Sequence, residues 1–435
     1  MADVRPFRGI HYNTSLLHDW AKVICPVYDI IPPGQHERLY SLSPYNFVRL
    51  EAGRELPQDT PSDNKYTRAA ATLDEWLKNA VLETDPLPSV YMHDHLFTFK
   101  GANYRRRALI ARVRLEEWDK MVIRPHESTF AEARSDRLSL LWSIRANTSS
   151  ILSMFDDHEG NIRRLLAEQE SKLPFMDLPM SGGEGHRVWA LSDPGTVGKI
   201  SAHMSGLPIY IADGHHRYES ALAYRRQQRA VSSSHEERPF DFVMMTMVAF
   251  DEPGLLILPP HRLVRGISKA TLQDLRHRLA VFFTIRELDS TNGAVWERLD
   301  EQRKADDKPR LVLFGLEGNA LLVLEPRDMG SLTPMMPHFR SELYKRLEVS
   351  IIDHVVLEKL LALDHEKDGV NLGYSYNRDD AMGRVRNGEY QLTFLLEPIS
   401  PSVIKAIADL SDKMPKKSTY FYPKVPAGLI LNRLV

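Results

Sequence analysis

Cysteine is nearly absent from this sequence, which has a single one, Cys25, in 435 residues. One thiol excludes an intramolecular disulfide framework, a redox pair and a cysteine-rich zinc site. An excess of charge of one sign is lacking too, because 56 Lys and Arg stand against 58 Asp and Glu. The formal net charge of -2 leaves no global basic field to hold a polyanion, so a dedicated nucleic-acid binder is disfavoured.

Long hydrophobic runs are also lacking. The amino-terminal stretch, residues 1–20, contains no apolar signal core, and no window approaches the roughly 18–20 apolar residues that a membrane span needs. Together with the lone cysteine, these absences predict a soluble protein of the reducing cytoplasm. A hydrophobic fraction of 43% and a charged fraction of 26% are typical of a globular chain and not of a disordered or fibrous one.

Predicted strands and helices are interspersed along the chain. Residues 66–80 place apolar side chains at helical spacing, which predicts a helix packed on a core. Residues 90–116 predict two antiparallel strands joined by a turn, and residues 310–325 predict a second hairpin. Residues 351–363 predict an amphipathic helix. This mixture predicts an α+β or mixed α/β fold.

The length predicts more than one hydrophobic core, because a chain of 435 residues exceeds what a single core usually supports. We place a boundary near residues 265–270, which gives a first domain with insertions over 1–265 and an α+β domain over 266–435. The last segment, 414–435, mixes cations with aromatic residues. We expect this segment to return to the first domain, where it would complete a site formed by other residues.

One predicted junction carries more polar and flexible residues than a plain turn requires. The stretch GLPIYIADGHHRYESALAYRRQQ (206–228) runs from an apolar strand through Asp213 and Gly214 into a helix. The N-terminus of a helix binds anions through its free backbone N–H groups and its dipole, and Gly214 lets the backbone approach a ligand closely. Arg217 adds a forked donor suited to phosphate, and His215 and His216 add donors that are partly protonated near neutral pH.

Asp213 is the odd member of this junction, because a carboxylate repels phosphate unless it holds a metal ion, accepts a proton or caps the helix. We interpret it as a magnesium ligand or a general base. The alternative is that Asp213 is the N-cap residue of the helix and the histidines are surface residues. The adjacent histidines and arginine favour an anion site.

Two further groups of residues are candidates for the same chemistry. Arg124, His126 and Glu127 precede another predicted helix, where Glu127 is a candidate general base or metal ligand, His126 a candidate catalytic residue and Arg124 a candidate phosphate contact. The alternative is a carboxylate that only stabilises a helix start. Near the C-terminus, Lys417 and Lys424 are candidate phosphate contacts in an aromatic segment, although a solvated edge strand has the same pattern.

Two histidines, His93 and His95, share a strand face around Asp94 at a spacing that suits a metal ion. No third ligand is evident in the sequence. We therefore expect a surface pair whose hydrogen bonds are satisfied, and no structural zinc site.

Several blocks of the sequence resemble one family. In order along the chain, VICPVYDII, RPHESTFAEARSDRLSLL, IYIADGHHRYESALAY, LLILPPHRLV and MPKKSTYFYPKVPAGLIL are similar to the blocks of domain-of-unknown-function family 1015, often described as ParB-related. One departure is that the family's Pro-Tyr-Asp appears here as Val27-Tyr28-Asp29. The family has no settled activity, so this resemblance implies conserved blocks and not a reaction.

A more distant resemblance connects the junction with nucleotide chemistry. The strand, Asp-Gly-His-x-Arg turn and helix are similar to the nucleotide-binding corner of ParB nucleotidases, sulfiredoxin and ParB-like free serine kinases. The kinase turn reads Asp-Gly-His-Thr-Arg, which implies matching roles for Asp213, Gly214, His215 and Arg217, with His216 in place of threonine. Sulfiredoxin carries a catalytic cysteine inside this turn and this chain does not, so sulfinic-acid reduction is disfavoured. The resemblance implies a ParB/sulfiredoxin-like nucleotide-binding core with a second α+β domain.

The expected function is that of a nucleotide-dependent phosphotransferase acting on a small hydroxylated metabolite. ATP, ADP or another nucleotide would place its phosphates at residues 214–217 with Mg²⁺ near Asp213, and Glu127 or Asp29 would accept the hydroxyl proton. The alternative is a regulatory nucleotide-binding protein, or a ParB-like DNA-associated protein, without transferase activity. The expected partners are thus a nucleotide and a small-molecule substrate, without a membrane; nucleic acid is disfavoured, and a homodimer is compatible with the sequence.

Overall fold

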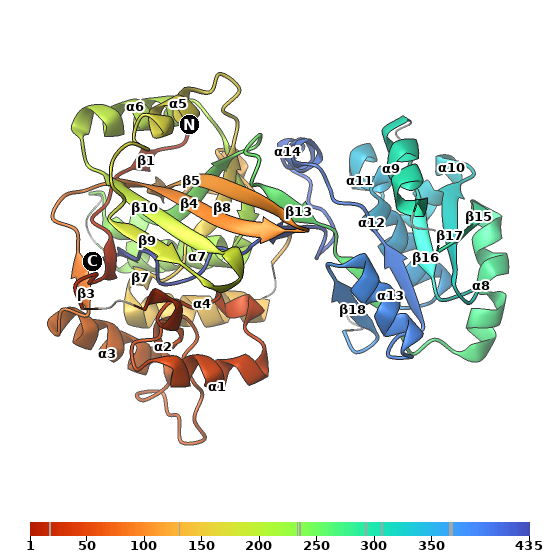
Figure 1. The fold of residues 1–435 in the computed structure, drawn as a ribbon, viewed down its shortest axis with the longest axis horizontal. Coiled ribbons are helices and arrows are strands. Elements are labelled where there is room, and N and C mark those ends of the chain that lie inside the picture. Colours follow the sequence, from red (N-terminus) through yellow and green to blue (C-terminus); the bar gives the residue numbers. More distant parts are fainter. Residues whose placement is uncertain are drawn as a thin grey trace. The chain divides into compact units, whose positions relative to one another are not determined.

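The computed structural model describes residues 1–16, 19–129, 131–232, 234, 236–291, 294–305, 308–364 and 369–435. Contacts among these residues divide the chain into two units. Unit 1 comprises Met1–Pro125, Thr129–Leu256 and Pro423–Val435, and unit 2 comprises His126–Ser128 and Ile257–Tyr422. Both units combine helices with strands, so the predicted mixed α/β class is confirmed (Figure 1).

A nine-stranded sheet forms the centre of unit 1 in the described part of the chain. The strand order is β6–β11–β8–β12–β5–β4–β10–β9, with β1 paired to β5. Neighbouring strands are antiparallel except for two parallel pairs, β6 with β11 and β8 with β12. The strands are β1 (Val4–Arg5), β4 (Val90–Phe99), β5 (Ala102–Arg114), β6 (Ile123–Arg124), β8 (Ile151–Phe155), β9 (Met176–Pro179), β10 (Gly185–Leu191), β11 (Ile209–Asp213) and β12 (Phe242–Ala249).

The hairpin predicted over residues 90–116 is confirmed by β4 and β5, which pair in antiparallel register. In the middle of this hairpin both faces are covered, because Arg106 and Arg107 are neighbours on β5 and both are buried. Each has a buried polar partner on β4. Arg107 forms two hydrogen bonds to the carboxylate of Asp94, and Arg106 donates to Nδ1 of His95.

Helices cover both sides of this sheet. Figure 1 shows α5 and α6 on the side of the unit 1 sheet opposite to α3 and α4, and α4 packs against both α3 and α7. The helix predicted over residues 66–80 is confirmed as α3, which the side chain of Asn64 caps. The helices of unit 1 are α1 (Pro33–Leu42), α2 (Val48–Glu51), α3 (Lys65–Lys78), α4 (Ala131–Ile144), α5 (Asn161–Ala167), α6 (Pro194–Ser205) and α7 (His215–Val231).

Two small ribbons complete unit 1. Strand β2 (Ile10–Tyr12) pairs with β3 (Leu82–Thr84). Strand β21 (Asn432–Arg433), near the C-terminus, pairs with β7 (Ala146–Asn147). Through the second ribbon, the C-terminal residues pair with the segment that follows α4.

Unit 2 contains a six-stranded antiparallel sheet in the order β15–β17–β16–β19–β14–β18. The hairpin predicted over residues 310–325 is confirmed by β16 and β17. The strands are β14 (His261–Val264), β15 (Phe283–Asp289), β16 (Leu311–Phe314), β17 (Ala320–Pro326), β18 (Leu372–Ser375) and β19 (Leu392–Leu395), and β13 (Leu256–Leu258) pairs separately with β20 (Tyr420–Tyr422).

Alternating residues of these strands enter two cores, one on each face of the unit 2 sheet. Leu311 and Leu313 of β16 belong to the core that includes α8, whereas Val312 and Phe314 belong to the core that includes α9 and α13. This alternation is the period-two pattern of a strand buried on both faces. The helices are α8 (Lys269–Phe282), α9 (Val295–Ala305), α10 (Met329–Leu332), α11 (Glu342–Arg346), α12 (Glu348–Ser350), α13 (Arg378–Arg386) and α14 (Pro401–Asp409).

The helix predicted over residues 351–363 is a π-helix, Ile351–Leu360, and the expected polar face is wrong. Its acidic residue Asp353 is buried and pairs with the buried guanidinium of Arg262 at 3.0 Å. The helix is therefore surrounded by unit 2, and its charge is neutralised internally.

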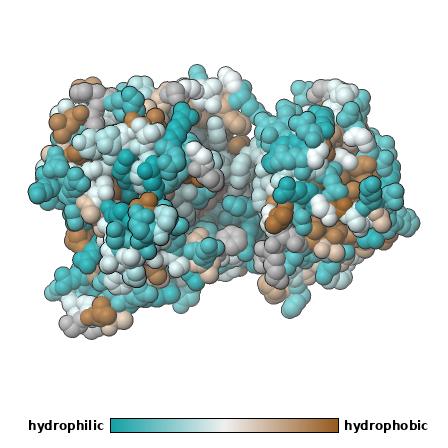
Figure 2. Space-filling model, turned by 90° about the horizontal axis from the view of Figure 1, so that it is seen from below, coloured by the Kyte–Doolittle hydropathy of each residue, from teal (hydrophilic) through white to brown (hydrophobic). Residues whose placement is uncertain are grey.

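Hydrophilic residues predominate on the face that Figure 2 shows, and hydrophobic residues form only small groups among them. Single exposed apolar side chains are normal on globular proteins. In the part of the chain that the structure describes, no helix is both long enough and apolar enough to cross a bilayer.

Candidate functional site

The predicted strand, turn and helix around Asp213 are formed by β11 and α7 in unit 1. β11 lies between β6 and β8, and its first four residues are buried. Gly214 follows in a left-handed conformation, with φ of 97°, and is the N-cap residue of α7, so the cap position itself has no side chain. The alternative interpretation of Asp213 as the helix cap is therefore wrong.

Position 214 requires glycine for two reasons, the closeness of a neighbouring side chain and the conformation of the backbone. A Cβ atom at this position would lie 2.9 Å from both Nε and Nη2 of Arg217, closer than real contacts allow. The guanidinium group thus lies directly against the glycine, beside the first turn of α7. A positive φ and this close approach together explain why the turn has no side chain here.

Three charged groups meet at the junction. Nη2 of Arg217 donates to the Asp213 carboxylate at 2.8 Å, and Lys424, from the C-terminal segment of unit 1, forms an ion pair with the other carboxylate oxygen. Burial would raise the pKa of Asp213, but the charges of Lys424 and Arg217 outweigh it and hold that pKa well below its usual range. Asp29 and Glu51 also act on the Arg217 guanidinium, so Asp213 is not the only carboxylate that balances these cations.

Arg217 has unused hydrogen-bonding capacity. Its Nη1 donates to the backbone oxygen of Ser150, whereas its buried Nε has no partner among the described residues. Burial alone would lower the pKa of Arg217. The negative charges of Asp213 and Asp29 raise this pKa by more than burial lowers it, so the guanidinium stays charged. A buried charged donor without an acceptor is costly, and an anion at this place would satisfy it.

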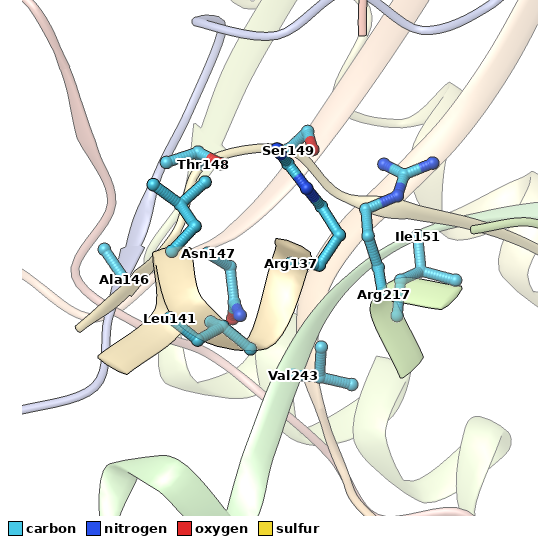
Figure 3. Close-up of a pocket in the computed structure, with 10 residues that line it drawn as sticks. Arg137, Leu141, Ala146, Asn147, Thr148, Ser149, Ile151, Arg217 and Val243 are labelled. Atoms are coloured by element: carbon cyan, nitrogen blue, oxygen red, sulfur yellow. The ribbon is translucent and has the colours of Figure 1, made fainter. Parts of the chain in front are cut away.

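A small pocket of about 30 Å³ opens beside Arg217. Figure 3 shows the guanidinium groups of Arg137 and Arg217 at one end of this pocket with Ser149, while Leu141 and Val243 lie toward the other end. The pocket is therefore cationic at one end and apolar at the other.

Glu51 is a buried carboxylate that sequence reasoning missed. It accepts hydrogen bonds from the hydroxyls of Thr148 at 2.6 Å and Ser149 at 3.0 Å. It also lines a second pocket of about 200 Å³, which Tyr28 and Arg137 line as well. Arg137 lines both pockets, and its guanidinium lies 3.9 Å from the centre of the Tyr28 ring. The only sequence signal for this residue is an acidic side chain at the end of the apolar stretch NFVRLE.

The other predicted residues of unit 1 lie as follows. Asp29, in the 3₁₀ turn Tyr28–Ile30, is near enough to Arg217 to raise its pKa. His215 is buried and its charge contributes to the lowered pKa of Asp213, and His216 is half-buried in the same first turn. Arg124 does not join the Asp213 cluster in its described contacts: it donates to the backbone oxygen of Met121 and to the hydroxyl of Tyr210 on β11.

The remaining predicted residues, His126, Glu127 and Lys417, belong to unit 2. Glu127 accepts a hydrogen bond from the backbone N–H of Ser418 at 3.2 Å, and Nε2 of His126 lies 3.1 Å from the hydroxyl oxygen of Thr419. Lys417 lies beside Ser418 in a left-handed conformation, with φ of 57°. Two blocks far apart in the sequence thus meet within unit 2. That Glu127 shares a pocket with Asp213 stays a prediction.

The expectation of a surface pair at His93 and His95 is wrong. Their exposed fractions are 1% and 0%. The physical reason is strand pairing: β10 lies beside β4 and places His186 directly opposite His95.

Comparison with known proteins places this chain in a family. The family described as "Protein of unknown function (DUF1015)" matches residues 4–350, and the chain belongs to it. A search among curated proteins finds no match.

Three solved structures are similar to parts of the chain. A conserved hypothetical protein from Pyrococcus furiosus is 12% identical, with a TM-score of 0.34, over 74% of this chain and 93% of that one. A free serine kinase in complex with AMP is 12% identical, with a TM-score of 0.34, over 74% and 92%. A C-terminally truncated SbnI from Staphylococcus aureus is 12% identical, with a TM-score of 0.32, over 73% and 84%.

Proposed function

We propose that this protein is a phosphotransferase that moves a phosphoryl group from a nucleotide to a hydroxyl group of a small metabolite. In this reaction the acceptor oxygen attacks the terminal phosphorus, the bond between that phosphorus and the bridging oxygen of the nucleotide breaks, and the hydroxyl proton passes to a carboxylate. Such a reaction depends on positioning and on neutralising charge.

The observation that carries the proposal is the buried Nε of Arg217, which has no hydrogen-bond partner among the described residues and lies beside the start of α7. The N–H groups of a helix start, a fixed guanidinium and an ammonium group match the oxygens of a polyphosphate. Lys424 supplies the ammonium group from a segment that is distant in the sequence. Asp213 holds both cations in place and keeps the local charge moderate before the nucleotide arrives.

We propose that the rest of the nucleotide lies toward the adjoining pocket, which would have to widen to admit it. Its cationic end at Arg137 and Arg217 would face the phosphates, and its apolar end at Leu141 and Val243 would face the base. ATP and ADP are the nucleotides we propose to test first. Ser149, which lies at the cationic end and bonds Glu51, connects this pocket with the second one, where an acceptor of small size would bind.

Magnesium fits this site only as a partner of the nucleotide. The Asp213 carboxylate already contacts Arg217 and Lys424, so it offers no complete cage for the ion. Mg²⁺ is commonly held by one or two carboxylates together with substrate phosphates, and Asp213 could supply one such oxygen if Lys424 turned toward the phosphates.

We assign the role of proton acceptor to Glu127 and a supporting role to His126. The backbone N–H of Ser418 orients the Glu127 carboxylate. We also propose Lys417 as a phosphate contact and Asp29 as the second candidate for the base.

Phosphoryl transfer tests the proposal. The protein would be incubated with γ-³²P-labelled ATP, Mg²⁺ and a panel of hydroxy amino acids, sugars and polyols, and the labelled products separated; ADP as donor would be followed by AMP release. Glu127→Gln should keep nucleotide affinity within about twofold and lower turnover at least 100-fold, because general-base catalysis contributes roughly 10²–10⁴. Glu132 is an exposed carboxylate in the first turn of α4. Glu132→Gln is therefore the matched control and should leave turnover unchanged.

Two results would redirect the proposal. Equal turnover by the wild type and Glu127→Gln would show that Glu127 is not the general base and would favour Asp29 in that role. Tight duplex-DNA binding that falls steeply with salt, without any transfer from ATP or ADP, would favour the ParB-like alternative and contradict the phosphotransferase.

A further inference from the structure

A buried cluster of histidines lies on one face of the unit 1 sheet. His95 on β4 and His186 on β10 are directly opposite in the strand register, and His93 is two residues from His95 on the same face. The exposed fractions of the three residues are 1% or less. Three imidazole rings in a protein interior are unusual without a compensating function, because each ring has two polar nitrogens.

A carboxylate completes the cluster. Oε1 of Glu184 lies 2.9 Å from Nε2 of His95 and 3.8 Å from Nε2 of His186. The three atoms that could bind a metal, one from each residue, all lie within 4.8 Å of one another. The two distances from Glu184, 2.9 and 3.8 Å, bracket the separation of about 3.4 Å between the ligand atoms of a tetrahedral ion with bonds of about 2.0–2.2 Å.

His186 provides an independent indication of a ligand. Its Nε2 is buried and has no hydrogen-bond partner among the described residues. Its Nδ1 lies 3.1 Å from Nε2 of His93. When Nδ1 donates to His93, Nε2 of His186 carries a lone pair that points toward Glu184, which is the tautomer that a metal ligand needs, with His93 as the group that orients it.

His95 is held in place from its other side. Nη2 of Arg106 donates to Nδ1 of His95 at 3.0 Å and to the backbone oxygen of Pro423 at 2.8 Å. With Nδ1 accepting, Nε2 of His95 carries the proton that it donates to Glu184. To bind a divalent cation through Nε2, His95 would take the other neutral tautomer: the ring proton moves from Nε2 to Nδ1, and Nη2 of Arg106 keeps its hydrogen bond to the backbone oxygen of Pro423.

We propose that His95, His186 and Glu184 bind one divalent first-row transition metal ion, for which zinc is the reference. Imidazole nitrogens select such ions over Mg²⁺ and Ca²⁺, which prefer oxygen ligands alone. Three protein ligands leave a coordination position open for water or a substrate group. The side chain of Glu184 is 38% exposed, so an ion can enter from that side.

Zinc binding to the full-length protein tests this proposal. Protein prepared without a histidine tag and stripped with EDTA would be titrated with Zn²⁺ in competition with a chromophoric chelator. The wild type should bind one Zn²⁺ per chain, Glu184→Gln should bind at least tenfold more weakly, and His186→Gln at least 100-fold more weakly. Co²⁺ should give visible d–d bands in the wild type that His186→Gln lacks.

Matched controls separate this site from adventitious binding and from misfolding. His158 is 73% exposed and lies near Asp156 and Glu159, so His158→Gln removes a surface cluster of the same chemistry and should not change the affinity. Because His186 is buried, circular dichroism and thermal melting would show whether each variant still folds. Glu184 is half-exposed, so Glu184→Gln tests the site without changing a buried residue. No zinc binding by the wild type, or unchanged binding by a folded Glu184→Gln, would overturn the proposal.

Discussion

Substituting Gly214 by alanine tests the geometry of the α7 junction in the most local way. The substitution places a methyl group where φ is 97° and where the guanidinium of Arg217 lies 2.9 Å away. A non-glycine residue in the left-handed region costs roughly 1–2 kcal/mol. The guanidinium is the end of a flexible side chain, so it can move aside, but it then leaves the place where we expect phosphate.

The expected magnitude for binding follows from the hydrogen bond that Arg217 would lose. A hydrogen bond to a charged group contributes about 1.5–3 kcal/mol. Gly214→Ala should therefore weaken ATP or ADP binding roughly 10- to 100-fold. Isothermal titration calorimetry measures the Kd, and urea unfolding followed by circular dichroism measures the loss of stability.

Gly198 offers a matched control for this experiment. It lies in α6 with nothing within 4 Å of an added Cβ and no positive φ. Gly198→Ala should leave nucleotide affinity unchanged and stabilise the protein by about 0.5–1 kcal/mol, because alanine is the better helix former. Equal nucleotide affinity in Gly214→Ala and the wild type would refute the role given to the Arg217 guanidinium.

Three further perturbations address neighbouring groups. Lys424→Met removes one of the two cations at Asp213, so the pKa of Asp213 should rise toward its usual value and ATP affinity should fall about tenfold by calorimetry, whereas Lys424→Arg should retain most of it. Burial would raise the pKa of Asp136, but Arg137 and Lys65 lower it to about 2. Because this pKa lies below the unfolded value of 3.8, the stabilisation is present above that pH and is lost as pH falls toward 2; urea midpoints of Asp136→Asn should lack this decline. Glu51→Gln should lower stability by about 1–3 kcal/mol in urea unfolding, since Thr148 and Ser149 lose their charged acceptor, and an unchanged midpoint would contradict this.

The strand and helix around Gly214 could be predicted because their signals are local. A short apolar run, a glycine and a helical repeat follow one another within residues 206–228. The same holds for α3 and for the hairpin of β4 and β5, where periodicity and turn residues decide the structure.

Contacts between distant segments could not be predicted from such signals. The ion pair of Lys424 with Asp213 joins residues 211 positions apart, and the contact of His93 with His186 spans 93. Period-two alternation shows which residues share a strand face but not which strand lies beside it. The sequence pattern therefore predicts His93 at the surface, whereas His186 on the neighbouring strand β10 contacts it.

Glu51 shows a second limit of sequence reasoning. Its carboxylate lies at the end of the short helix α2, and nothing in its immediate sequence indicates burial. Its partners Thr148 and Ser149 follow β7, nearly a hundred positions away. A buried carboxylate is tolerated only when distant donors satisfy it, and those donors are known only from the fold.

Calorimetric titration of ATP with Mg²⁺ into the wild type, Arg217→Gln and Arg226→Gln tests the central claim most directly. Arg226 lies on the same helix, but its side chain is 62% exposed and pairs with Glu117, so it is the matched control. We predict one nucleotide per chain in the wild type, at least tenfold weaker binding in Arg217→Gln, and affinity within twofold of the wild type in Arg226→Gln. Failure of the wild type to bind ATP or ADP, or equal affinity in Arg217→Gln, would contradict a phosphate site at the start of α7.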